Sequence, residues 1–70
     1  MPHVTIKMWT GRSDEIKTRL SEKVAQTIAD DLGCKLSDVT VAVDDVNKED
    51  WVDQVVSKEI ENNPNIYFKK

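Results

Sequence analysis

The sequence predicts an α/β fold, in which two parallel strands form a small sheet with a long helix on one face and a shorter second helix follows near the C-terminus. The first observation behind this prediction is an apolar position that recurs every four residues over about residues 14–32. The second is that alternating apolar and polar residues precede and follow this stretch. Strand, long helix and strand in this order form a β-α-β unit with a right-handed crossover.

The first strand and the long helix have clear sequence signals. Val4, Ile6 and Met8 alternate with the residues between them, which predicts a strand over residues 1–9. A turn at Gly11 and an N-cap at Ser13 should start the helix, and residue 33 is a glycine, the usual C-terminal stop. The predicted apolar stripe of this helix consists of Ile16, Leu20, Val24, Ile28 and Leu32, widened by Ala25.

The second half of the chain repeats these patterns over shorter stretches. Residues 39–44 alternate again, with three valines on one face, and predict the second strand. A second helical face over about residues 49–61 should end before Pro64. The predicted residues of this face are Trp51, Val52, Val55, Val56 and Ile60.

One face of the predicted sheet has nothing in the chain to cover it. The long helix should pack on the face that carries the valines, and little sequence remains for the opposite face. A two-stranded sheet with one bare side is incomplete as a monomer, so we expect self-association to complete it. The opposite face carries His3, Thr5, Lys7, Trp9, Thr40, Ala42 and Asp44.

Length and composition narrow the functional classes. Seventy residues suit one domain over residues 1–70, and a net charge of −3 argues against a nucleic-acid partner. No apolar run approaches the roughly 20 residues that span a bilayer. One cysteine and no signal sequence indicate the cytoplasm, and a single histidine beside that cysteine argues against a zinc site. There is no glycine-rich phosphate loop, and we expect neither metal nor cofactor.

Pro2 is the first candidate for chemistry. Initiator methionine is generally removed before a small residue such as proline, and its removal would expose a secondary amine at the start of a rigid strand. An exposed α-amino group titrates at roughly 7.7–8.0 and the secondary amine of proline higher. This amine is the one group in the chain that is placed to act as a base near neutral pH. The alternative is that Pro2 simply begins an edge strand, a position that proline tolerates.

The remaining polar residues offer fewer candidates. Arg12 lies in the loop after the first strand, where a guanidinium can hold a carboxylate through two parallel hydrogen bonds. Taken alone, however, this position favours a surface charge. His3 is expected to be a surface or interface residue, and Cys34 a passive one. Adjacent carboxylates such as Asp44 and Asp45 point to opposite faces of a strand and do not converge.

Pro2 at the start of an alternating strand and the segment Gly11-Arg12-Ser13-Asp14-Glu15 resemble the 4-oxalocrotonate tautomerase family. The similarity extends through the helix to Trp51. The resemblance implies that Pro2, once N-terminal, is the general base and acid in keto–enol tautomerisation of a 2-hydroxydienoate or enolpyruvate-type acid. It also implies that Arg12 binds the substrate carboxylate, that Trp51 lines the pocket, and that Trp9 occupies the place of an apolar pocket residue.

The chain departs from the family archetype in two places. Thr40 stands where the archetype has a second arginine, which removes a cation that would help to hold a dicarboxylate. The archetype also ends in a glycine-rich hairpin that holds its hexamer together, whereas a helix is predicted here. This ending is similar to that of the phenylenolpyruvate tautomerase branch, whose members are dimers, so a dimer is favoured and a hexamer stays open.

Two rival functions use the same scaffold. One is dehalogenation or decarboxylation of a short unsaturated acid, which needs a water-activating carboxylate that is not evident beside Pro2. The other is a non-catalytic oligomeric interaction module that keeps Met1, because a retained methionine turns the nitrogen of Pro2 into an amide without basicity.

Overall fold

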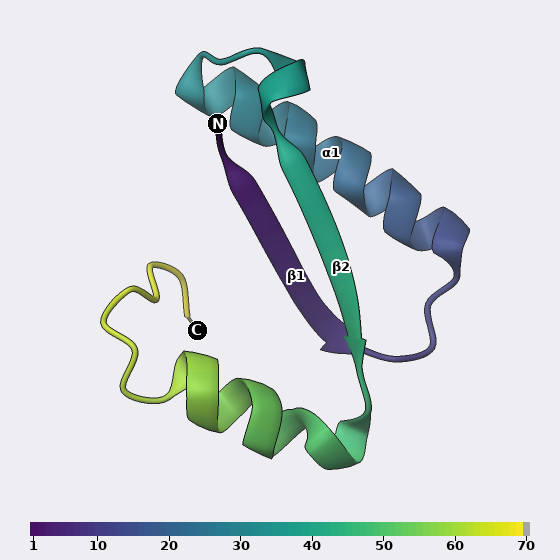
Figure 1. Cartoon of the computed structure of the whole chain (residues 1–70), viewed down its shortest axis with the longest axis vertical. Coiled ribbons are helices and arrows are strands. Elements are labelled where there is room, and N and C mark those ends of the chain that lie inside the picture. The colour runs from purple at the N-terminus through teal and green to yellow at the C-terminus, as the bar shows by residue number, and fades with distance from the viewer. Residues whose placement is uncertain (70) are drawn as a thin grey trace.

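The β-α-β unit predicted from the sequence is confirmed. The structure is a computed structural model that describes residues 1–69. Strand β1 (His3–Trp9) leads through helix α1 (Asp14–Leu32) and a short 3₁₀ turn, η1 (Leu36–Asp38), to strand β2 (Thr40–Val46). The two strands are parallel, and α1 lies behind them in Figure 1. A second 3₁₀ turn, η2 (Lys48–Asp50), and a nine-residue helix, η3 (Val52–Ile60), follow.

Strand β2 begins and ends later than the alternation of residues 39–44 predicts. The backbone N–H of Val39 donates to the carbonyl of Leu36 at 3.1 Å, so this residue closes η1 instead of opening the strand. At the other end β2 continues to Val46, whose carbonyl accepts from the N–H of Thr10 at 3.2 Å. The pairing register aligns His3 with Thr40 and runs without interruption to the far end of both strands.

Helix α1 has the bounds that its caps predict. The Ser13 hydroxyl accepts a hydrogen bond from the N–H of Ile16 at 3.3 Å, and Gly33 adopts a left-handed conformation with φ of 68°. The apolar stripe is only partly covered, since its central residues are half-buried and its end residues Ile16 and Leu32 are 40% and 67% exposed.

The second helix exists, but it is not an α-helix. Within η3 the hydrogen bonds reach five residues back, as in the bond from the Glu61 N–H to the Val56 carbonyl at 2.8 Å. Each turn therefore holds more than the about 3.6 residues of an α-helix. Val52, which the sequence places on the apolar face, is 59% exposed, whereas Val55 is buried.

The molecule has a small core and an open shape. Among residues 1–69 the side chains that are buried are Ala29, Val46 and Val55. The accessible surface is 5671 Å², whereas a compact monomer of 8.0 kDa exposes about 4,450 Å². No described helix covers the sheet face opposite α1 (Figure 1), and Thr5 and Thr40 on that face are exposed.

Among residues 1–69, no helix combines the length and the apolar character that crossing a membrane requires.

The docking of η3 can be tested with two valines of the same helix. Replacing buried Val55 with alanine should lower the free energy of unfolding by about 2 kcal/mol, because it removes apolar contacts and leaves a cavity. The matched change at exposed Val52 should alter it by less than about 0.5 kcal/mol. Urea unfolding measures both values, and equal losses would show that η3 is not packed as described.

Candidate active site

Three of the four predicted site residues lie together. Arg12, Trp9 and Trp51 line one pocket at the carboxyl end of β1. Its volume is about 510 Å³, within the range of roughly 300–1,000 Å³ that is typical of small-molecule sites. The remaining lining residues are Lys7, Met8 and Leu20.

Four parts of the chain build this pocket. Trp9 is the last residue of β1, and Arg12 follows in the loop that leads to α1. Gly11 has a φ of 125°, a conformation that L side chains rarely adopt, so this loop requires glycine before Arg12. Helix α1 supplies Leu20, and Trp51 lies at the junction of η2 and η3. The pocket therefore depends on the position of the second helix as well as on the β-α-β unit.

The two tryptophans form the aromatic wall. Their ring centroids are 6.3 Å apart and their planes meet at 86°, which is an edge-to-face contact. The Lys48 ammonium lies 4.7 Å from the centroid of the Trp9 ring, close enough for a cation–π contact. Trp9 is nevertheless 44% exposed, so much of its ring can still contact a ligand or another protein chain.

Pro2, the fourth predicted residue, is not part of this pocket. It precedes β1, whereas the pocket lies at the other end of that seven-residue strand. At about 3.3 Å for each strand residue, roughly 20 Å separates the two ends. The Pro2 carbonyl accepts from the N–H of Thr40 at 3.2 Å, which fixes it to the start of β2. Met1 is 94% exposed, so its removal would cost little packing.

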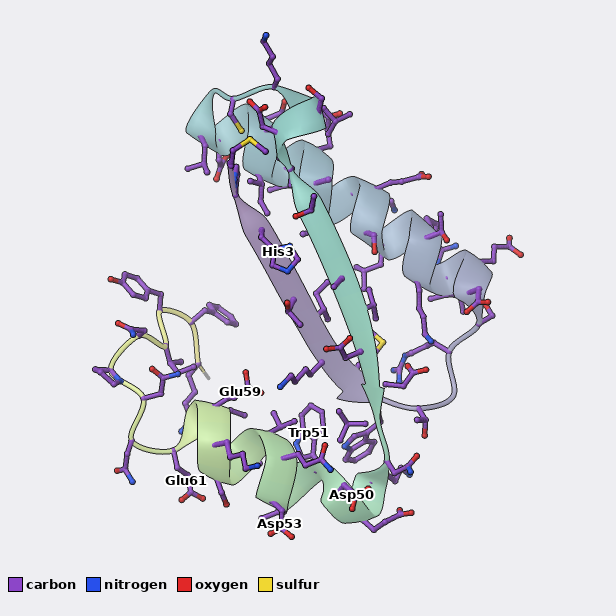
Figure 2. The ribbon with its side chains drawn as sticks, viewed as in Figure 1. His3, Asp50, Trp51, Asp53, Glu59 and Glu61 are labelled. Atoms are coloured by element: carbon purple, nitrogen blue, oxygen red, sulfur yellow. The ribbon has the colours of Figure 1, made fainter. Side chains whose placement is uncertain are left out.

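A hydrogen-bonded histidine lies next to Pro2 on the open face. The Nδ1 atom of His3 is 2.6 Å from the Thr40 hydroxyl, and its Nε2 atom is 3.2 Å from the Thr5 hydroxyl. Figure 2 shows His3 on the side of the sheet turned away from α1. The Thr40 hydroxyl is thus hydrogen-bonded to a side chain of β1.

Sequence reasoning missed Lys7 and Glu59. Lys7 lines the pocket and forms an ion pair with Glu59 of η3. The strand period could have indicated Lys7, because it lies two residues before Trp9 on the same face. No sequence signal indicated Glu59, whose position depends on the path of η3.

A larger groove does not match the predicted chemistry. It has a volume of about 1000 Å³ and lies between α1 and β2, where polar side chains of α1 such as Lys17 and Glu22 face apolar residues of β2 such as Val41. Neither Arg12 nor a tryptophan borders it, so we place the candidate site in the smaller pocket. Among residues 1–69, no group of three or more histidine, cysteine, aspartate or glutamate side chains could hold a metal ion.

Comparison with known proteins decides the family. The family model described as "Tautomerase enzyme" matches residues 2–60. The chain belongs to the tautomerase family. This match starts at Pro2 and includes Arg12 and both tryptophans, and it confirms the resemblance found in the sequence. Membership supports an isomerase that acts as a tautomerase on small molecules.

Individual members of the tautomerase family agree with this assignment. A probable tautomerase of Xylella fastidiosa (strain 9a5c) is 44% identical over 61 residues, which are 87% of this chain and 74% of that protein. The 2-hydroxymuconate tautomerase of Bacillus subtilis (strain 168) is 35% identical over 51 residues, 73% of this chain and 82% of that protein.

A solved tautomerase structure is similar as well. It comes from work on the 4-oxalocrotonate tautomerase isozymes of Methylibium petroleiphilum, and it superposes with a TM-score of 0.68 at 36% sequence identity. The superposition covers 71% of this chain and 81% of that chain. The fold expected from the sequence is therefore also the fold of a solved member of the family.

The contact between the two tryptophans should be measurable as a coupling energy. In a double-mutant cycle of Trp9→Ala and Trp51→Ala, we expect about 1 kcal/mol of coupling in the free energy of unfolding, because edge-to-face pairs contribute beyond their buried area. A control cycle with Trp9→Ala and Tyr67→Ala should give a value near zero, since Tyr67 is 95% exposed. Independent effects at Trp9 and Trp51 would refute the contact.

Proposed function

We propose that this member of the tautomerase family moves a proton between oxygen and carbon of a 2-hydroxydienoate or enolpyruvate-type carboxylate, with Pro2 as base and acid. The observation that carries the proposal is the pocket that joins Arg12 to the aromatic wall of Trp9 and Trp51. This pocket combines a carboxylate-binding cation with an apolar surface, which are the two features that an unsaturated organic acid requires.

Pro2 would carry out the proton transfer. After removal of Met1, the secondary amine accepts the proton of the enol hydroxyl while the carbonyl forms. The resulting ammonium then returns a proton to carbon, so the reaction needs neither a metal nor a redox partner. A base that titrates near the working pH is the most efficient for such a transfer.

Arg12 would bind the substrate carboxylate. Its planar guanidinium can donate two parallel hydrogen bonds to the two carboxylate oxygens, which fixes the orientation of the reacting carbon. Trp9 and Trp51 would contact the unsaturated chain of the substrate and exclude water from it.

The separation of Pro2 from Arg12 requires a second protomer in this proposal. The roughly 20 Å between the ends of β1 exceeds the reach of both side chains. Two copies that pack their bare sheet faces with β1 antiparallel would bring Pro2 of one protomer to the pocket of its partner. The surface in excess of a compact monomer, about 1,200 Å², is also enough for a specific interface.

The stoichiometry and location complete the proposal. We favour a dimer, because the chain continues after β2 into the helix η3, where the hexameric archetype has a hairpin. A cytoplasmic location agrees with the single cysteine of the sequence.

The role of Pro2 predicts the result of a conservative substitution. Pro2→Ala, produced without Met1, should lower kcat/KM for phenylenolpyruvate or 2-hydroxymuconate at least about tenfold, because a primary amine on a freely rotating residue replaces the rigid secondary amine of proline. Pro64→Ala, a change at the second proline of the chain, should leave turnover unchanged. Full activity of the Pro2 variant would show that the reaction does not depend on the secondary amine of Pro2. Mass spectrometry of the natural protein is a second check, since a mature mass that includes Met1 would exclude the mechanism.

A shared site predicts complementation between inactive variants. Pro2→Ala and Arg12→Ala should each have little activity as pure proteins. Co-expressed in equal amounts, they should recover about a quarter of the wild-type activity, because a quarter of the sites combine an intact Pro2 with an intact Arg12 from the other protomer. No recovery in mixed oligomers, verified by mass spectrometry, would show that each site belongs to one chain.

A further inference from the structure

The pocket contains a second cation that the proposed mechanism does not use. Lys7 lines it together with Arg12, and the Lys7 side chain is 33% exposed. Lys48 is also close, but it lies over the Trp9 ring and is not one of the lining residues. With two cations facing the ligand, the pocket would suit an acid that carries two carboxylates.

Glu59 compensates one of these two positive charges. Its carboxylate forms an ion pair and a hydrogen bond with the Lys7 ammonium. In Figure 2 the Glu59 side chain points from η3 toward the sheet, whereas those of Asp53 and Glu61 point away from it. Among residues 1–69 the ion pairs are Lys7–Glu59 and Lys17–Asp45, so Arg12 is engaged in neither.

We propose that Glu59 is a specificity-determining residue, which neutralises Lys7 and so directs the pocket toward acids with one carboxylate and an apolar body. This inference rests on the proposed function, because it concerns the substrate that Arg12 holds. A single carboxylate binds Arg12, while the rest of the molecule contacts the tryptophans, Met8 and Leu20. A second carboxylate would instead meet a lysine whose charge is already compensated and the negative charge of Glu59.

Two ligands that differ only in the second carboxylate test this inference. Sorbate and muconate both have a six-carbon chain with a conjugated diene, and muconate carries a second carboxylate where sorbate has a terminal methyl group. Their dissociation constants can be measured by quenching of the tryptophan fluorescence of the full chain, independently of any turnover. In the variant Glu59→Gln, the ratio of the muconate affinity to the sorbate affinity should rise about fivefold. The expected change is modest because Glu59 is partly exposed and its charge is therefore screened by solvent.

Three control variants test whether a change in the affinity ratio comes from the charges of Glu59 and Lys7. Glu61→Gln removes the same charge from a side chain that points away from the sheet, and it should leave the ratio unchanged. Lys7→Gln keeps Glu59 and should shift the ratio about fivefold in the opposite direction. The double variant Lys7→Gln/Glu59→Gln should return the ratio to the wild-type value, because both charges are gone.

The outcomes separate this inference from the proposed function. An unchanged ratio in folded Glu59→Gln, or a shift that persists in the double variant, would overturn the role of Glu59 even if the wild-type protein is an active tautomerase. If Glu59→Gln fails to fold, Lys7→Gln alone decides, and an unchanged ratio in that variant overturns the inference. Failure of the Pro2 experiments would refute the tautomerase mechanism without altering these binding ratios.

Discussion

The parallel pairing of β1 with β2 is the constraint on which the rest of the structure depends. Parallel neighbours require a crossover, and α1 provides it on one face only, so the other face stays bare. The same pairing fixes Pro2 beside Thr40 at one end of the sheet and leaves Arg12 beyond the other end. The proposed division of the site between protomers follows from this arrangement.

The small core is a second reason to expect contacts between protomers. A β-α-β unit of this size buries few side chains, and here Ala29 is the one buried residue of α1. Association of two protomers would cover the bare face and would also bring Pro2 of one protomer close to Arg12 of the other. In the proposed assembly, folding stability and catalysis would therefore depend on the same contacts.

The bounds of an element can be predicted from the sequence when the contacts that fix them lie within a few residues. Ser13 and Gly33 end α1 through contacts within a few residues, and both bounds were predicted correctly. Residues 39–44 showed the alternation of β2 but not its ends, which depend on bonds made by Val39 and Val46 to other segments. Arg12, Trp9 and Trp51 were predicted as site residues from a family pattern, and the structure brings them together. Glu59 could not be predicted, because its contact with Lys7 depends on the path and winding of η3.

The winding of η3 determines whether the Glu59 carboxylate faces the pocket. In this helix each residue turns the chain through a smaller angle than in an α-helix, since the hydrogen bonds reach five residues back. Over the eight residues from Trp51 to Glu59 these differences accumulate to a large rotation. Deleting one residue, or rewinding the segment as an α-helix, would turn the carboxylate away from the sheet while every pocket residue kept its identity. The electrostatic character of the pocket thus depends on the number of residues per turn in a neighbouring helix.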